Sequence, residues 1–171
     1  MDKKHEILKA AFDIFCEKGY HLSVSELADA VNIKTPSLYS HFANKDEIIE
    51  LVIRDEIQRY YSCLTDKMLE ASNLSCKEAM KILYVYVIDY FSKDKRLRFW
   101  RALPFIQNQQ LNSISAQLIA DNDRIFKQQM EQCFSKGLDN GEIRPDVSPG
   151  ALRLYLCMIQ GVLDGMLLYP K

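Results

Sequence analysis

Residues 34–47 read KTPSLYSHFANKDE. This stretch holds two helix-start signals, Thr35-Pro36 and Asn44, with room for barely two turns of helix between them. Thr35 suits the N-cap and Pro36 the first helical position, where the N–H that proline lacks would have no helical partner. Leu38 and Phe42 are four residues apart, so we expect both to face a core. The other side chains of this short helix then point outward or flank that face: Ser37, Tyr39, Ser40 and His41.

The residues before this stretch predict two further helices. Apolar residues recur with helical spacing from Leu8 to Phe15, and Gly19 is a suitable stop. Ser23 and Glu26 form the S-x-x-E pattern of a capping box, which starts a second helix that ends near Asn32.

Two short helices joined by a tight turn, Ser23–Val31 and Pro36–His41, behind a supporting first helix predict a helix-turn-helix. The second helix of this motif enters the DNA major groove with its N-terminal residues leading, so it can be short. Lys34 and Lys45 flank it and are placed to meet phosphates. The alternative is a helical hairpin whose polar face is only solvated. Residues 1–47 hold six lysines, no arginine and eight acids, so DNA affinity must come from local charge placement and from two copies acting together.

Composition limits the remaining possibilities. With 171 residues, 48% hydrophobic content and a net charge of −1, the chain fits one or two soluble domains. No apolar run approaches the roughly 20 residues that cross a bilayer, and no signal peptide is evident, so we expect a cytoplasmic protein without a membrane partner. Five scattered cysteines argue against a disulfide framework or a zinc site. Buried apolar cysteine is the preferred interpretation, and a redox-sensing cysteine stays possible.

Helical periodicity continues to the C-terminal end. We expect a long helix from Lys45 to about Ser72, a second from Ser75, a chain break near Trp100–Pro104, a third helix over roughly Ser113–Asp139, and a last one from Pro149 to Tyr169 after a Ser148-Pro149 start. The prediction is an all-α chain: a three-helix helix-turn-helix domain, residues 1–47, joined by a long helix to a second helical domain, residues 48–171.

Several motifs resemble the N-terminal domain of the TetR family of transcriptional regulators. They are Gly19-Tyr20, SVSELA at 23–28, VNIKTPSLYSHF at 31–42 and NKDE at 44–47, of which L-Y-x-H-F-x-x-K at 38–45 is the most specific. The resemblance implies a homodimer whose N-terminal domains bind a palindromic DNA operator and whose helical C-terminal domains bind a small ligand.

The resemblance also implies roles for individual residues. Thr35 and Tyr39 would face bases, while phosphates would be held by His41, Lys45 and the helix start at Ser23 and Ser25. The full set expected at the DNA is Ser23, Ser25, Lys34, Thr35, Pro36, Ser37, Tyr39, Ser40, His41 and Lys45. The chain departs from the family pattern at Asn32, Lys34 and Pro36. Since Pro36 cannot donate a backbone N–H, no operator sequence can be inferred.

The C-terminal part offers a dimer interface and a ligand site. The last helix is apolar on two sides, so its own domain covers one side and a second subunit the other. One side carries Leu154, Cys157, Met158, Gly161, Gly165 and Leu168; the other carries Leu152, Tyr155, Ile159, Val162 and Met166. The family layout implies dimerisation through Asp121–Asp139 and Pro149–Tyr169.

Aromatic residues and methionine suit an adaptable apolar pocket, although each one alone also fits a plain core. The candidates are Tyr60, Tyr61, Tyr84, Phe91, Phe99, Trp100, Phe105, Met130 and Phe134. Asp89 could neutralise a cationic ligand or lie at a solvated helix edge.

The sequence therefore favours a repressor that an unknown small, largely apolar effector releases from its operator. The alternative is an activator or nucleoid-associated regulator of the same fold that answers to a protein partner. We do not expect an enzyme or a cofactor: all three histidines lie in the first 41 residues, and no phosphate loop, metal-ligand spacing or nucleophile motif is present.

Overall fold

The computed structural model describes residues 2–93, 95–147 and 150–169. Within these ranges the chain is helical and contains no strand, as the sequence predicts. Contacts divide the chain into two compact units. Unit 1 comprises residues 1–59 and 98–119, and unit 2 comprises residues 60–97 and 120–171. This grouping differs from the functional division expected at residue 47, which stays a prediction.

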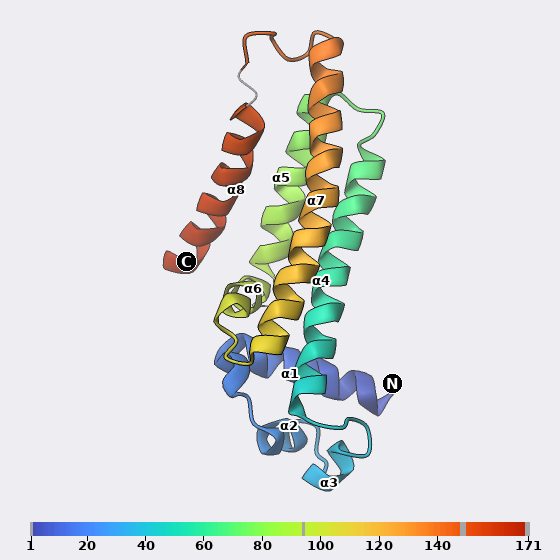
Figure 1. Cartoon of the computed structure of the whole chain (residues 1–171), viewed down its shortest axis with the longest axis vertical. Helices are drawn as coiled ribbons and strands as arrows, with labels where there is room; N and C mark the ends of the chain where they lie inside the picture. The colour runs from blue at the N-terminus through green and yellow to red at the C-terminus, as the bar shows by residue number, and fades with distance from the viewer. Residues whose placement is uncertain (1, 94, 148–149, 170–171) are drawn as a thin grey trace. The chain divides into compact units, whose positions relative to one another are not determined.

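Unit 1 contains the first three helices: α1 (Lys3–Lys18), α2 (Val24–Ala30) and α3 (Thr35–Leu38). The start of α4 (Lys45–Glu70) packs with them (Figure 1). A short 3-10 helix, η1 (Gly19–His21), joins α1 to α2.

The helix ends in unit 1 follow from local chemistry. Asp2 caps α1 by accepting the Lys4 N–H at 3.2 Å, and Gly19 ends it with a φ of 56°. Asn32 takes a φ of 54° in the turn between α2 and α3, a conformation that asparagine tolerates better than most residues. The sequence expectation for this turn is confirmed.

Unit 1 also takes in a segment that is distant in sequence. It consists of the end of α6 (Arg96–Ala102), the 3-10 helix η2 (Leu103–Phe105) and the start of α7 (Gln109–Asp139). Phe99 is fully buried there, and its ring centroid lies 5.1 Å from that of Phe12 and 5.0 Å from that of Phe15. Aromatic packing thus joins this segment to α1.

One boundary in this segment agrees with the sequence prediction and one differs. The expected chain break near Trp100–Pro104 is present, because α6 ends at Ala102 and the chain then tightens into η2. α7 starts at Gln109 rather than near Ser113, because the Asn108 side chain accepts the Leu111 N–H at 3.1 Å and so caps the helix earlier.

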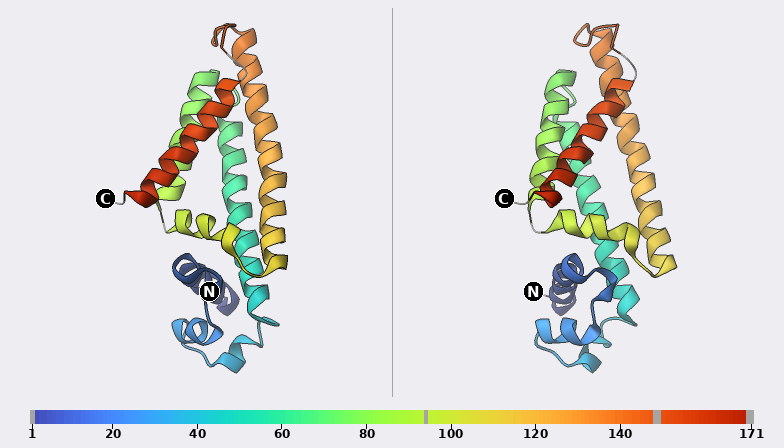
Figure 2. Two further views of the ribbon diagram at one scale, coloured as in Figure 1. Left: turned by 60° about the vertical axis from the view of Figure 1, so that its left-hand side comes forward. Right: turned by 90° about the vertical axis from the view of Figure 1, so that its left-hand side faces the viewer.

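Unit 2 is built from the end of α4, α5 (Cys76–Ser92), most of α7 and α8 (Gly150–Leu168). Ser75 and Glu78 form a capping box at the start of α5. α8 joins α5 through the Tyr155 hydroxyl, which donates to the Met80 carbonyl at 2.6 Å. Figure 2 shows α8 in two further views. The expected Ser148-Pro149 helix start lies outside the described residues.

α8 corrects the expectation that no apolar run approaches membrane-spanning length. It has 19 residues, and an 18-residue window within it has a mean hydropathy of 1.4. By length and composition alone the helix could therefore span a membrane, although only 17% of that window is buried within the chain. The core helix of a soluble protein passes the same test, so one such helix is weak evidence for a membrane span. The expected two-sided character is present, because Leu152 and Ile159 are buried while Leu154 and Met158 are exposed.

Candidate nucleic-acid interface

The recognition segment (residues 34–41) consists of α3 with the residue before it and the turn after it. Leu38 and Phe42 are 0% and 2% exposed and anchor the segment to the core of unit 1. Tyr39 is 48% exposed, and its backbone N–H still donates to the Thr35 carbonyl at 3.4 Å. The division between a buried face and an outward face is as predicted.

The start of α3 differs in detail from the prediction. Lys34, not Thr35, takes the N-cap position, no side chain caps the helix, and Pro36 lies within its first two residues. Regular α-helix ends at Leu38, so the expected range Pro36–His41 is wrong at both ends. The proline explains why no side-chain cap is needed, because it removes one of the N–H groups that a cap would satisfy.

The outward surface of the recognition segment is polar. Among the residues expected at the DNA, only Thr35 and Lys45 are half-buried, and the rest are exposed: Ser23, Ser25, Lys34, Pro36, Ser37, Tyr39, Ser40 and His41. The Ser40 hydroxyl donates to the Ser37 carbonyl at 2.7 Å, which stabilises the turn after α3. These short polar side chains and one aromatic ring fit the donors, acceptors and methyl groups that base edges present in the major groove.

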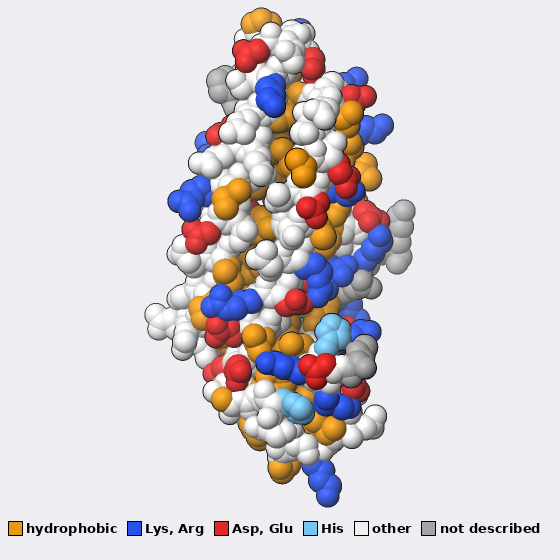
Figure 3. Space-filling view, turned by 90° about the vertical axis from the view of Figure 1, so that its right-hand side faces the viewer, with side chains coloured by type: hydrophobic (Ala, Val, Ile, Leu, Met, Phe, Trp, Pro, Cys, Tyr) orange, Lys and Arg blue, Asp and Glu red, His pale blue; other side chains and the backbone are white. Residues whose placement is uncertain are grey.

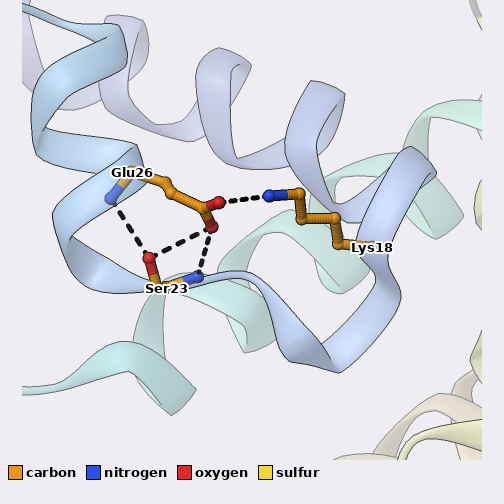
Figure 4. A network of polar contacts seen from close by, with 3 residues as sticks. All are labelled: Lys18, Ser23 and Glu26. Carbon is orange, nitrogen blue, oxygen red and sulfur yellow. Dashed lines mark hydrogen bonds and ion pairs between the residues drawn. The ribbon is translucent and has the colours of Figure 1, made fainter.

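The start of α2 is fixed by the polar network in Figure 4. The Ser23 hydroxyl accepts the Glu26 N–H at 3.2 Å, and the Glu26 carboxylate accepts the Ser23 N–H at 3.2 Å. Glu26 also pairs with Lys18. The lysine, together with the Ser23 N–H, lowers the pKa of the Glu26 carboxyl. Ser23 thus serves as the cap of α2.

Lys45 is held within the fold. Its amine donates to the Tyr20 carbonyl at 3.0 Å and lies 4.0 Å from the centre of the Tyr20 ring. An ammonium group has three donors, so Lys45 keeps donors for a phosphate while its position is set by these two contacts. Asn44 caps α4 as predicted, accepting the Glu47 N–H at 2.9 Å.

Behind this surface lies a hydrogen-bond network that sequence reasoning missed. Asp46, in the first turn of α4, accepts the Tyr20 hydroxyl at 2.9 Å with one oxygen and the Asn108 side-chain amide at 2.9 Å with the other. Asn108 at the same time caps α7. The Asn108 cap is a recognisable helix-start signal, but its pairing with Asp46, 62 positions away, has no local signature.

Charges around the interface are mixed. The face drawn in Figure 3 carries Lys and Arg side chains interspersed with Asp and Glu, with no single basic patch. This agrees with the excess of acids in residues 1–47. Any DNA contact must therefore rest on individually placed donors more than on a broad positive field.

The residues expected at a ligand fall into both units. Phe99, Trp100 and Phe105 belong to unit 1: Phe99 packs in the core, the Trp100 indole N–H donates to the buried Glu56 carboxylate at 3.4 Å, and Phe105 is 82% exposed. The other candidates belong to unit 2: Tyr60, Tyr61, Tyr84, Phe91, Met130 and Phe134.

Unit 2 brings several of these aromatic residues together. The centroid of the Tyr60 ring lies 4.9 Å from that of Tyr61, 5.0 Å from that of Tyr90 and 5.2 Å from that of Phe91. Burial raises the pKa of the Tyr60 and Tyr61 phenols, so both stay neutral. The Arg96 guanidinium lies 4.6 Å from the Tyr90 ring.

Polar candidates in unit 2 are already paired. The Tyr61 hydroxyl donates to the Asp123 carboxylate at 2.5 Å. Asp89 is exposed and pairs with Lys93 at 2.6 Å, which confirms its place at a solvated helix edge.

Comparisons with known proteins agree with this geometry. Residues 7–52 match the family described as "Bacterial regulatory proteins, tetR family". The chain is 22% identical to the HTH-type transcriptional repressor KstR2 of Mycobacterium tuberculosis over 85% of this chain and 71% of that protein.

Two solved structures share the fold. The fatty acid degradation regulator FadR from Bacillus halodurans superposes with a TM-score of 0.74 at 19% identity, covering 98% of this chain and 86% of the other. FadR from Bacillus subtilis in complex with stearoyl-CoA gives 0.67 at 19% identity, covering 95% and 83%.

The Asp46 network yields a stability prediction. In Asp46→Asn one of the two acceptor oxygens becomes an NH2 group and the charge is lost, so Tyr20 and Asn108 no longer each face an acceptor oxygen. We expect the free energy of unfolding to fall by about 1.5–3 kcal/mol, as for other hydrogen bonds to a charged group. Tyr20→Phe removes one of the two bonds and should cost less. Urea unfolding measures both, with Asp13→Asn, at an exposed position of α1, as the control. Equal stability of Asp46→Asn and Asp13→Asn would contradict a structural role for the network.

Proposed function

Because the chain belongs to the TetR family of bacterial transcriptional regulators, which are not enzymes, we propose that it is a homodimeric repressor that a small, largely apolar ligand releases from its operator. The observation that carries the DNA-binding part is the recognition segment, whose polar surface is exposed while Leu38 and Phe42 are buried beneath it. We retain the alternative of a regulator controlled by a protein partner for the case in which no ligand binds.

In the proposed complex α3 enters the major groove, and its first residues meet base edges. Tyr39 offers a ring for thymine methyl groups and a hydroxyl for a base edge or a phosphate. Thr35 and Ser37 offer hydroxyls that both donate and accept. Lys34, Lys45 and the first turn of α2 supply phosphate contacts on either side.

The dimer is supported by the uncovered face of α8. Leu154 and Met158 are 72% and 53% exposed, and a Cβ added at Gly161 or Gly165 would meet nothing within 4 Å. Exposed apolar side chains beside small residues permit close approach of a second helix. The proposed interface combines this face with residues 121–139 of α7. Two subunits would then hold their recognition helices about one turn of DNA apart, roughly 34–36 Å.

The apolar ligand is supported by the aromatic cluster in unit 2 and by the comparison with FadR, a protein solved with stearoyl-CoA. We propose an acyl chain as the ligand class, because neutral phenol and phenyl rings bury hydrocarbon at little desolvation cost. Release requires the ligand to favour a state with altered recognition helices. A coupling of about 1–3 kcal/mol changes operator affinity about 5- to 150-fold.

α4 and the Asp46 network are the proposed route of this coupling. α4 is continuous from Lys45 to Glu70, so it contributes residues to both units. At its first turn Asp46 is bonded to Tyr20 and Asn108, so the start of α4 and the start of α7 are fixed to each other within unit 1. If α4 or α7 shifts, either the hydrogen bonds of Asp46 break or Tyr20 and Asn108 move with it.

Tyr39 provides the test of DNA recognition. Tyr39→Ala should weaken binding to DNA flanking the protein's own gene by about 5- to 150-fold, the effect of about 1–3 kcal/mol of base contact. Tyr39→Phe separates the hydroxyl from the ring, and Leu69→Ala, at an exposed position of unit 2, is the control. Gel shifts at two salt concentrations measure affinity, and unchanged melting shows that the variants fold. Equal affinity of Tyr39→Ala and wild type would exclude Tyr39 from the interface.

Met158 tests the dimer. A carboxylate at this position would be buried without a partner if α8 packs on a second subunit, so Met158→Glu should shift the protein from dimer to monomer. Met158→Leu keeps the apolar surface and should remain dimeric. Sedimentation velocity measures the oligomeric state. A wild-type protein that sediments as a monomer at micromolar concentration would contradict the proposal.

Stearoyl-CoA is the first ligand to test. We expect it to release the protein from its DNA in a gel shift, whereas coenzyme A, which lacks the acyl chain, should not. Isothermal titration with the protein alone then separates binding from release. Binding of neither compound, together with specific DNA binding, would favour control by a protein partner.

A further inference from the structure

Two cysteines of unit 2 lie in contact although 57 positions separate them. Cys76 is the first residue of α5, and Cys133 lies in α7; their sulfur atoms are 3.4 Å apart. All five cysteines are free thiols in the described structure. A disulfide bond is about 2.05 Å long, so the two sulfur atoms need to approach by little more than 1 Å to bond.

The backbone around Cys76 is held against α7. Gly137 lies one helical turn after Cys133, and a Cβ at this glycine would be only 2.8 Å from the Cys76 Cβ. From the other side, the Cys76 N–H donates to the Glu142 carboxylate at 2.7 Å. The start of α5 is thus fixed between the α7 backbone and the loop that follows α7.

The two thiols differ in accessibility. Cys76 is 4% exposed, and its pKa is raised to about 12, first by burial and then by Cys133 and the nearby Glu142 carboxylate. Cys133 is only half-buried. A small oxidant therefore reaches Cys133 first, and Cys76 is the sulfur positioned to react next.

We propose that Cys76 and Cys133 are a peroxide-oxidised dithiol that closes an intrachain disulfide between α5 and α7. In the first step the Cys133 sulfur attacks hydrogen peroxide, the O–O bond breaks, and Cys133 becomes a sulfenic acid with release of water. In the second step the Cys76 sulfur attacks the Cys133 sulfur and the S–O bond breaks. The departing hydroxide takes the Cys76 thiol proton as a second water.

The electron balance is complete. The two thiols lose two electrons and two protons, and one peroxide is reduced to two waters. A thiol reductant such as dithiothreitol restores both cysteines by exchange. Neither step involves DNA or a ligand, so this inference stands independently of the proposed function.

The disulfide would join the start of α5 to α7 and close a loop of 57 residues. Cross-linking a loop of this size restricts the unfolded chain, so oxidation should raise the melting temperature by about 5–15 °C.

The test uses the whole protein, reduced and then treated with a small excess of hydrogen peroxide. After alkylation, non-reducing digestion and mass spectrometry should find a peptide that links Cys76 to Cys133. The melting temperature should rise and return to its starting value with dithiothreitol. Cys63→Ser, which removes another half-buried thiol of unit 2, should behave as wild type. Cys133→Ser should abolish the linked peptide and the rise.

Cys76→Ser gives an independent readout. Without its partner, the Cys133 sulfenic acid should persist and react with dimedone, which adds a defined mass. Peroxide-treated wild type in which Cys76 remains fully alkylatable while Cys133 or the exposed Cys157 is over-oxidised would overturn the proposal. So would dimedone labelling of Cys133 that is equal in wild type and Cys76→Ser.

Discussion

The recognition segment depends on the burial of two side chains. α3 has four helical residues, far fewer than an isolated helix needs in water, so its conformation cannot come from helix propensity. Leu38 and Phe42 supply the missing stability by entering the core of unit 1. The turn from Tyr39 to His41 carries the chain between them, so every exposed group of the recognition segment is positioned by these anchors.

Charge placement around that surface shows how unit 1 uses its acids. Three of its acids accept hydrogen bonds from nearby donors: Glu26 from the α2 start, Asp46 from Tyr20 and Asn108, and Glu47 from the Ala43 N–H. They complete helix starts and connect elements of unit 1. In the proposed DNA complex the lysines at the edges of the segment act individually, so binding responds to salt according to the few phosphates that it neutralises.

Local patterns predicted most of the fold, and distant contacts escaped them. The Ser23 capping box, the helix start at Ser75, the Asn32 turn and the buried pair Leu38 and Phe42 follow from residues within one or two turns of each other, where spacing determines contact. The errors at the α3 cap and the α7 start are shifts of a few residues, as expected where several residues can end a helix. Asp46 with Asn108, and Cys76 with Cys133, are pairs that only the packed chain brings together. The ligand candidates divide between the units for the same reason, because an aromatic residue in a core and one in a pocket look alike in sequence.

The anchoring of the recognition segment assigns fold stability and surface chemistry to different residues. Leu38 and Phe42 contribute stability, whereas Lys34, Ser37 and Tyr39 project from the surface and contribute little to it. Surface positions of this kind usually tolerate substitution within about 0.5 kcal/mol. If the outward positions contact the operator as proposed, a descendant of this chain could acquire a new operator sequence through changes there alone, without compensating mutations in the core. The short, externally anchored helix thus leaves its outward side chains free to change while the fold stays stable.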